Sequence, residues 1–330
     1  MPRFDILGIG ENTIDMVMEL AHFPALGSKE KLHALRAMPG GQVATAMIAC
    51  QRWGLRTHYV GCVGDDGAAA LHRRELRRVG VRSHLVAIPG RASRLSFILL
   101  DKASGERTIL WKRDRRLTLS PRNLRKGWVY TARLLYVDGH DPATTALAAR
   151  WARQEEIPVM GDFDHLSDGL RHLMPFVDYA VTSRDFPRQA TGEKDLFRAL
   201  QLLSSKYGFR LICATLGVDG ALAWDGRRFW YAPSYQVRVV DTTGAGDLFH
   251  AGVAYGILHR WDLKRILNFS SAAAALNCKA IGAQGRICSL RTVEAMQHRG
   301  RRNRSLFSRS HLERASVRAR RMSGESESVF

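Results

Sequence analysis

The apolar positions along this chain follow two patterns, short β-type runs and longer stretches with helical spacing. After residue 130 the two patterns alternate, with helical spacing over segments such as 143–154 and 196–206. Strands that alternate with helices are typical of a parallel sheet covered by helices on both faces. The sequence therefore predicts an α/β fold. The apolar runs predict strands at Leu134–Val137, Ile157–Gly161, Val177–Val181 and Arg210–Ala214, and a hairpin at the sheet edge over 221–232.

The first 115 residues show a different arrangement. The apolar run at Phe4–Ile9 predicts a buried strand, and the small residues of 43–53 predict a helix. Four other segments alternate between apolar and polar positions as half-buried strands do. They predict a small second sheet built from 13–20, 31–38, 94–100 and 107–111. No internal repeat or linker divides the chain, so we expect a single domain over 1–298.

The stretch Asp241–Asp247 carries the most specific chemistry. It follows an apolar run at 237–240 that predicts a strand, and it precedes a predicted helix that runs to about residue 260. Gly244 and Gly246 lack Cβ atoms, which lets backbone N–H groups approach a ligand at a helix N-terminus that favours anions. A carboxylate at 247 would repel a phosphate. That cost makes sense if the carboxylate must accept a proton from an attacking hydroxyl group. The alternative is a tight turn with Asp247 as a helix cap.

Other polar residues follow the predicted strands and are expected at the same edge of the sheet, where open α/β sheets bind ligands. Gly40 and Gly41 precede the helix at 43–53, and Asp15 lies in the strand at 13–20. Gly8 and Gly10 fit a dinucleotide fingerprint poorly because Thr13 stands where it needs glycine. The strand-end residues are Asp138, His140, Asp162, Asp164, Ser183, Asp185 and 215–220.

Composition places the chain among soluble globular proteins. No apolar run approaches the ~20 residues of a membrane span, and the N-terminus lacks a signal-peptide pattern. The histidine spacings match no known transition-metal motif. We therefore expect a cytoplasmic protein without a membrane association and without a dedicated transition-metal site. The cysteines form no CxxC pair and lie in apolar contexts that predict buried free thiols, at Cys50, Cys62, Cys213, Cys278 and Cys288.

The formal net charge of +19 raises the question of nucleic-acid binding. The segment 299–330 holds nine arginines, three glutamates, many serines and few large apolar residues, which is typical of a disordered tail. Such a tail binds RNA, membrane surfaces or acidic proteins non-specifically, or has no selected partner. We favour the last interpretation and expect the tail to be dispensable for activity.

Three motifs, in the order found here, resemble those of the PfkB/ribokinase-like carbohydrate kinases. Gly40-Gly41 with the 61–67 segment is similar to the family's N-terminal signature, and Asp241–Phe249 to its C-terminal signature. The segment 215–220 resembles the nucleotide-side loop. The likeness runs from Phe4 to about Leu290. It implies a Rossmann-like three-layer α/β/α sandwich with a small β-sheet lid from about 12–38 and 93–113.

The resemblance also implies an activity and site residues. The activity is transfer of the γ-phosphoryl group of ATP to a hydroxyl group of a sugar-like substrate, with Mg²⁺ arriving with ATP. Asp247 would be the general base, and Gly244, Ala245 and Gly246 would form the anion hole. The substrate side would comprise Asp15, Gly40, Gly41, Thr45, Arg107 and Asp162, and the ATP side Thr215, Gly217, Gly220 and Thr243.

Two departures from the family pattern concern the substrate and the metal. Thr45 stands where the family usually has Asn, in a form similar to sulfofructose-kinase-like members, so the substrate is expected to differ from ribose. Ser183–Phe186 stands in place of the usual Asn-x-x-Glu, so Asp185 would assist Mg²⁺ through water. Asp241 and the loop 280–285 lie where some members bind a monovalent cation such as K⁺.

Several alternatives stay open at this stage. Lid cations favour an anionic sugar, although a neutral ketose also fits; these are Arg94, Arg107, Lys112 and Arg113. A nucleoside kinase of the same fold would hold a purine between Phe97 and Trp111. A ligand-sensing or nucleic-acid-binding pseudokinase would use the arginine-rich tail. A homodimer through the lid is common in the family, and nothing in the sequence decides it.

Overall fold

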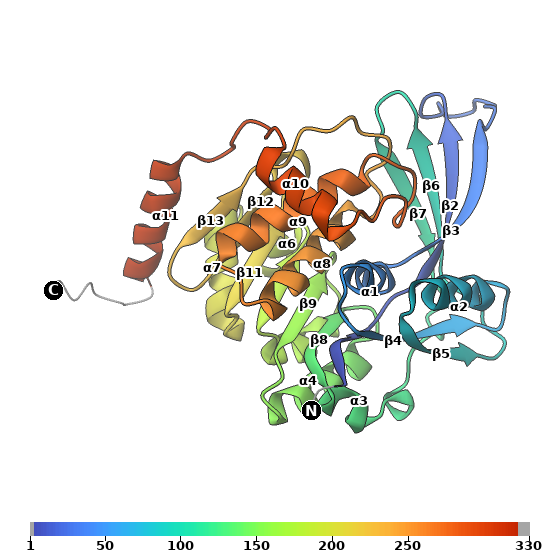
Figure 1. Ribbon diagram of the computed structural model, residues 1–330, viewed down its shortest axis with the longest axis horizontal. Helices are drawn as coiled ribbons and strands as arrows, with labels where there is room; N and C mark the ends of the chain where they lie inside the picture. Colours follow the sequence, from blue (N-terminus) through green and yellow to red (C-terminus); the bar gives the residue numbers. More distant parts are fainter. Residues whose placement is uncertain (1–2, 323–330) are drawn as a thin grey trace.

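A large, mostly parallel sheet forms the centre of the protein (Figure 1). A computed structural model describes residues 3–322, and all structural statements below concern that part of the chain. The sheet order is β13-β12-β11-β10-β9-β8-β1-β4-β5. Only two pairings are antiparallel, those of β12 (Ala221–Trp224) with β11 and with β13 (Phe229–Ala232). The parallel strands are β1 (Phe4–Ile9), β4 (Thr57–Gly64), β5 (Arg82–Ile88), β8 (Ala132–Asp138), β9 (Val159–Phe163), β10 (Tyr179–Thr182) and β11 (Leu211–Thr215).

Helices cover both faces of this sheet because its strands are apolar on both faces. In β8, Leu134 and Tyr136 pack into one hydrophobic core while Leu135 and Val137 pack into the other. The first face is covered by α1 (Gln42–Arg52), α2 (Ala68–Val79), α8 (Ala245–Leu258), α9 (Leu263–Asn277) and α10 (Leu290–Arg299). The second is covered by α3 (Lys126–Tyr130), α4 (Pro142–Gln154), α5 (Leu170–Leu173), α6 (Phe186–Thr191), α7 (Leu196–Tyr207) and α11 (Arg309–Met322). The three-layer α/β fold expected from the sequence is confirmed.

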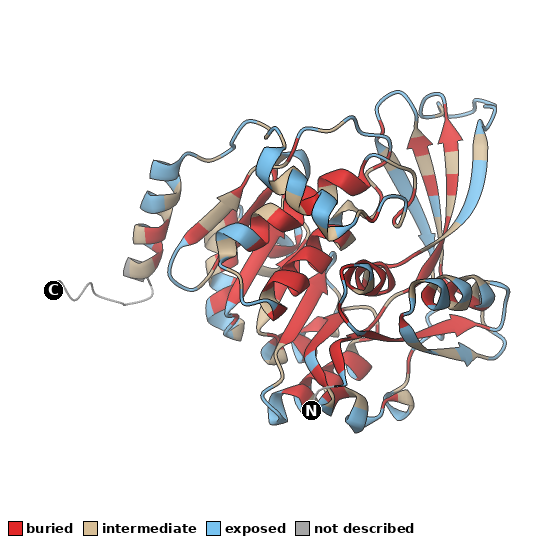
Figure 2. Ribbon diagram, in the orientation of Figure 1, coloured by how far each residue is buried: buried red, intermediate tan, exposed pale blue. Residues whose placement is uncertain are grey.

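The smaller sheet projects from one end of the molecule as the lid (Figure 1). Its order is β3 (Ala34–Gly40), β2 (Thr13–Leu20), β6 (Leu95–Asp101) and β7 (Arg107–Lys112). Val17, Ile98 and Leu100 form a small core on one face. Much of the lid is exposed, in contrast to the buried central sheet (Figure 2). Three of the strands fall within the two ranges given above for the lid, and β3 runs two residues beyond the first range, to Gly40.

One local expectation from the sequence is wrong, and one strand was not expected. The apolar run at 237–240 is not a strand, because no neighbouring strand pairs with it within the described residues, and Val239 and Val240 are exposed. β5 was not predicted, because the first three residues of this edge strand are polar and none of its residues is fully buried. The cysteines are all free thiols, and four of the five are buried, as expected.

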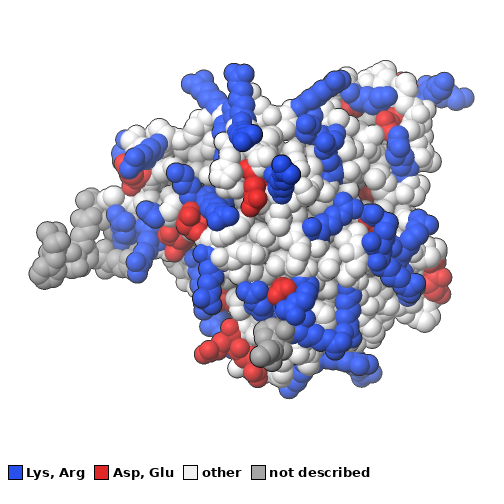
Figure 3. All heavy atoms as spheres, viewed as in Figure 1, with Lys and Arg blue, Asp and Glu red and all other residues white. Residues whose placement is uncertain are grey.

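The expectation of a disordered tail also fails over 300–322. After α10 the chain runs alongside 234–236, and α11 then packs against α7 and β13. Phe307, Leu312 and Ala319 supply an apolar face that the averaged composition of the segment conceals. Residues 323–330 lie outside the described residues. Lysine and arginine side chains are spread over the whole face shown in Figure 3, so the basic charge is not a property of the tail alone.

No helix within residues 3–322 combines the length and apolar character needed to cross a membrane.

Candidate active site

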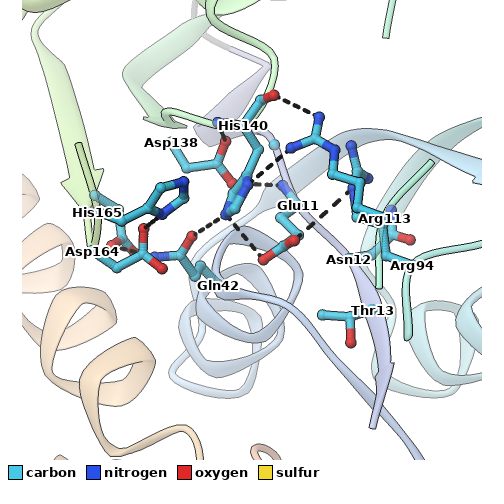
Figure 4. Close-up of polar contacts among 12 residues, drawn as sticks. Glu11, Asn12, Thr13, Gln42, Arg94, Arg113, Asp138, His140, Asp164 and His165 are labelled. Atoms are coloured by element: carbon cyan, nitrogen blue, oxygen red, sulfur yellow. Dashed lines mark hydrogen bonds and ion pairs between the residues drawn. The ribbon is translucent and has the colours of Figure 1, made fainter. Parts of the chain in front are cut away.

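A cluster of charged side chains lies at the carboxyl ends of β1 and β8, where the strand order switches direction (Figure 4). Asp138, at the end of β8, accepts hydrogen bonds from the backbone N–H groups of Glu11 (2.7 Å) and His140 (3.0 Å). Nε2 of His140 lies 3.2 Å from Oε2 of Glu11 and 3.0 Å from Oε1 of Gln42. Asp164 extends the cluster from the end of β9. Neighbouring parallel strands thus bring together residues that are far apart in the sequence.

Opposing influences set the protonation of this cluster. Burial opposes a charge on His140, but the carboxylates of Glu11 and Asp138 outweigh it and raise the pKa of His140 to about 9. Burial raises the pKa of Asp138 to about 6. The pKa of Glu11 is lowered in spite of burial, because His140 and Arg94 stabilise its charged form.

Asp247 lies in the first turn of α8, next to a glycine-bearing turn. Gly244 precedes α8 with φ +74°, and a Cβ atom there would lie 2.5 Å from the backbone of Ala283. No described side chain caps this helix, whose N-terminus carries the positive end of the helix dipole. The N–H group of Ala245 donates to the carbonyl oxygen of Thr242 at 3.2 Å. Burial and the negative charge of Asp162 raise the pKa of Asp247 to about 7, while His250 acts in the opposite direction. This carboxyl can exchange a proton near neutral pH.

Asp162, whose negative charge acts on Asp247, is fully buried near the end of β9 in the central sheet. Its Oδ2 accepts a hydrogen bond from the hydroxyl group of Tyr136 at 2.7 Å and lies 2.7 Å from Nδ1 of His250. Its Oδ1 accepts from Nε2 of Gln42 at 3.0 Å. Asp162 was expected to bind substrate, and the structure surrounds it with protein partners.

Asp15, in β2 of the lid, carries a third carboxyl with a raised pKa. Burial raises this pKa to about 7, although a 2.7 Å hydrogen bond from Thr13 opposes the shift. Gly40 lies against Asp15, because a Cβ atom at residue 40 would be 2.0 Å from the Asp15 carboxylate. Gly41 directly precedes α1 with φ +94°. Thr45 is buried in α1, 3.4 Å from Nε2 of Gln284. Two predicted substrate residues, Asp15 and Gly40, are therefore neighbours, and Gly41 and Thr45 lie at the start of α1 and within it.

A cavity of about 670 Å³ adjoins the start of α8. Its size is within the range of small-molecule sites. Three predicted ATP-side residues line it, Thr215, Gly217 and Gly220, together with Ala245 and Gly246 of the anion-hole turn. Arg107 was expected on the substrate side, but it lines this same cavity and its guanidinium group donates a hydrogen bond to Thr242.

Asp241 and Thr243 do not line this cavity and are hydrogen-bonded to each other. Oδ1 of Asp241 accepts hydrogen bonds from the N–H group (2.8 Å) and the hydroxyl group (2.7 Å) of Thr243. Oδ2 of Asp241 accepts from the N–H group of Gly282 at 2.7 Å, which ties the turn to the loop 280–285. Thr242 lines the cavity, whereas Thr243, which was expected on the ATP side, does not. Asp185 is exposed at the start of α6.

Two of the lid cations are paired within the protein. Nη2 of Arg94 lies 3.1 Å from Oδ2 of Asp141, and both side chains are 2% exposed. Nη2 of Arg113 lies 3.0 Å from Oδ1 of the same carboxylate. Asp141 thus holds both guanidinium groups, which were expected to face an anionic substrate.

Metal-binding groups are present beside the charged cluster. His140, Asp164 and His165 each offer one ligand atom, all within 4.8 Å of one another. His165 is already paired with Asp164, whose Oδ1 lies 2.6 Å from Nδ1 of His165. The two histidines are 25 residues apart in the sequence, so spacing motifs do not detect this group.

Sequence reasoning missed several residues of the site. Glu11 directly follows the Gly8-x-Gly10 end of β1, and the rule that ligands bind at strand ends would have found it. His250 lies three residues after Asp247 and so on the same side of α8, which helical spacing would have suggested. Tyr136 and Gln42 carry no such signal, because only the folded sheet brings them to Asp162.

Comparison with known proteins places the whole arrangement in a family. The model of the family described as pfkB family carbohydrate kinase matches residues 4–288. A fructosamine kinase of Bacillus subtilis is 26% identical over 288 residues, covering 85% of this chain and 93% of the relative. An ATP-dependent ribose-1-phosphate kinase of Halopiger xanaduensis is 25% identical, covering 84% and 93%. The crystal structure of a proposed ribokinase from Agrobacterium tumefaciens superposes with a TM-score of 0.83 at 26% identity, covering 89% of this chain and 97% of that one.

Proposed function

Because the chain belongs to the pfkB family of carbohydrate kinases, we propose that it transfers the γ-phosphoryl group of ATP to a hydroxyl group of a sugar or sugar-derived substrate. Asp247 is the general base. The observation that carries this proposal is a carboxyl with a pKa of about 7 at an uncapped, glycine-bearing helix N-terminus beside a cavity. A carboxylate there costs electrostatic energy that only proton transfer justifies.

The proposed phosphoryl transfer uses Asp247 and the N–H groups of the turn in front of it. Asp247 takes the proton of the substrate hydroxyl group as its oxygen bonds to the γ-phosphorus. The bond from the γ-phosphorus to the bridging oxygen breaks, and ADP leaves with that oxygen. The backbone N–H groups of Gly244, Ala245 and Gly246 donate to the transferring group and stabilise its negative charge.

The cavity fits ATP as the phosphoryl donor. It extends from Ala245 and Gly246 to the loop of Gly217 and Gly220, and Arg107 adds a positive charge close to the phosphate end. Mg²⁺ accompanies ATP and supplies charge neutralisation of the phosphates, with Asp185 assisting through water. Asp241 and the loop 280–285 are the proposed place of a monovalent cation.

The charges around the substrate half favour a neutral or amine-bearing sugar. Burial and nearby carboxylates act together on Asp15 and Asp247, and Glu11 is a neighbour of both. Arg94 and Arg113 are held by Asp141. These are two of the four lid cations that favoured an anionic sugar. The two relatives differ in this respect, since one is a kinase of fructosamine, an amine, and the other of ribose 1-phosphate, an anion.

The register of the lid argues against a nucleoside kinase. Trp111 pairs with Ser96, so it lies on the same face of the lid as Ser96, whereas Phe97 is the next residue and points to the opposite face. The two rings therefore do not form a sandwich for a purine. The presence of Asp247 with its raised pKa argues against a pseudokinase, because a protein that only binds ligands needs no base.

A coupled assay of ADP release from Mg-ATP tests the proposal. The acceptors are ribose, fructose, an N-alkyl fructosamine, ribose 1-phosphate and adenosine. We expect turnover with a ketose or a fructosamine and, among the sugar acceptors, the lowest kcat/KM with ribose 1-phosphate. ADP release that no acceptor stimulates would contradict the kinase proposal. Preference for ribose 1-phosphate would contradict the inference about charge and leave the kinase proposal intact.

A further inference from the structure

The part of the chain that follows the family match contributes to the nucleotide cavity. The family model ends at residue 288, and Asn303, well beyond it, lines the cavity. The chain around Asn303 runs antiparallel to 234–236. The N–H group of Asn303 donates to the carbonyl oxygen of Ser234 at 2.9 Å, and that of Gln236 donates to the carbonyl oxygen of Arg301 at 2.8 Å.

Arg302 fixes this segment in place. Its guanidinium group lies 3.7 Å from the ring centroid of Tyr235 and donates to the carbonyl oxygen of Pro233 (2.6 Å) and to Oδ1 of Asn268 (2.7 Å). A second link reaches the nucleotide-side loop, because the N–H group of Leu306 donates to the Tyr231 hydroxyl at 2.9 Å. That hydroxyl donates in turn to the carbonyl oxygen of Asp219 at 2.5 Å. The segment 301–306 is therefore held in place beside the cavity, and Asn303 is its residue that lines the cavity.

The hydrogen bonds around Ser234 determine how the Asn303 amide is turned. The Ser234 hydroxyl donates its only proton to the carbonyl oxygen of Val218, so its oxygen must accept from Asn303. Nδ2 of Asn303 is the donor, at 2.8 Å. Within residues 3–322, Oδ1 of Asn303 has no hydrogen-bond partner of its own. An oriented amide with an unused acceptor and one unused N–H bond thus borders the cavity.

We propose that Asn303 is a specificity-determining residue that recognises the adenine base of the nucleotide. This inference rests on the proposed function. Ser234 and Asn303 lie at one end of the stretch 235–240, and Thr242 and the phosphate-binding turn follow its other end. Adenine presents an amino group beside a ring nitrogen acceptor, which an asparagine amide matches with its oxygen and its N–H group. Guanine places a carbonyl oxygen where adenine has the amino group, so it would face Oδ1 without a proton.

This inference reverses the expectation that the tail is dispensable. Removal of 300–330 would open one end of the cavity and release the loop that Tyr231 holds, and it would also expose apolar surface beneath α11. Such a truncation changes too much to test a single contact. Point variants within 301–306 separate base recognition from folding.

The test measures binding of ADP and GDP, each by titration calorimetry without sugar, to the full chain, Asn303→Ala and Ser305→Ala. Ser305 is the matched control, since among residues 3–322 its exposed hydroxyl group donates only to the carbonyl oxygen of Phe307, in its own segment. We expect wild type to prefer ADP, and Asn303→Ala to weaken ADP about tenfold, in the range of a lost base contact. GDP binding by Asn303→Ala and all binding by Ser305→Ala should change less than twofold.

Three outcomes would overturn the inference: equal binding of ADP and GDP by wild type, unchanged ADP binding by Asn303→Ala, and equal weakening of both nucleotides. The last would mean that Asn303 only supports the segment 301–306. Asn303→Asp, which keeps the acceptor but lacks the N–H bond, should retain a smaller ADP preference than wild type if the variant folds normally. Wild type that binds neither nucleotide would contradict the proposed function itself.

Discussion

The imidazole of His250 lies 2.7 Å from a carboxylate oxygen of Asp162, three residues along α8 from Asp247. The two groups stabilise each other's charges, and the pKa of His250 is raised because Asp162 and Asp247 outweigh the effect of burial. Asp247 therefore experiences a negative and a positive neighbour with opposite effects on its pKa. Together with burial, which is the largest influence, this pair acts on the proton affinity of the proposed base.

The first prediction concerns the pH dependence of catalysis. A general base works only when it is deprotonated, and the pKa of Asp247 is about 7. We expect kcat/KM for the sugar to rise with pH and to reach half its plateau near pH 7. Asp15, with a pKa also about 7, titrates in the same range. A profile that is flat from pH 5.5 to 8.5 would contradict the assignment of Asp247.

Two variants should move this profile in opposite directions. Asp162→Asn removes the larger of the two electrostatic influences and lowers the pKa of Asp247, so the inflection shifts to lower pH. His250→Gln removes the opposing cation, so the inflection shifts to higher pH. Each profile is measured as kcat/KM at saturating Mg-ATP. Parallel shifts in both variants would show that the profile reports another group.

A second prediction separates structural from substrate-binding arginines. Arg94 is buried against Asp141, so Arg94→Met should lower the free energy of unfolding by about 3 kcal/mol, because a buried carboxylate loses a partner. The control is Arg116→Ala, whose side chain is 69% exposed, with an expected change below about 1 kcal/mol. Urea denaturation measures both. A stable Arg94→Met variant with a tenfold higher KM for sugar would instead indicate an anion subsite.

The glycines of the turn give a third prediction. Gly244→Ala requires φ near +74° and a Cβ atom 2.5 Å from Ala283, so we expect a loss of stability of about 1–3 kcal/mol together with loss of activity. Gly246 is helical, and its Cβ atom would point into open space beside the cavity. Gly246→Ala should keep or raise stability and increase the KM for ATP. Thermal unfolding and steady-state kinetics distinguish the two. Equal destabilisation by both substitutions would contradict this account of the turn.

Much of the fold was predictable because apolar periodicity reports burial directly. The alternation after residue 130 predicted β8 to β11, and the glycines and acid of 241–247 predicted the start of α8. The network around Asp162 was not predictable, because Tyr136 and Gln42 meet it only through the order of strands. The packing of 300–322 was missed because a few apolar residues, such as Phe307 and Ala319, determine it within a basic segment.

The most direct test of the central claim is the turnover of Asp247→Asn. This substitution keeps the shape of the side chain and removes the proton acceptor. We predict a fall in kcat of two to four orders of magnitude, about the contribution of a general base, with ADP affinity within threefold of wild type. Turnover within tenfold of wild type, with the nucleotide bound normally, would contradict the role of Asp247 as the base.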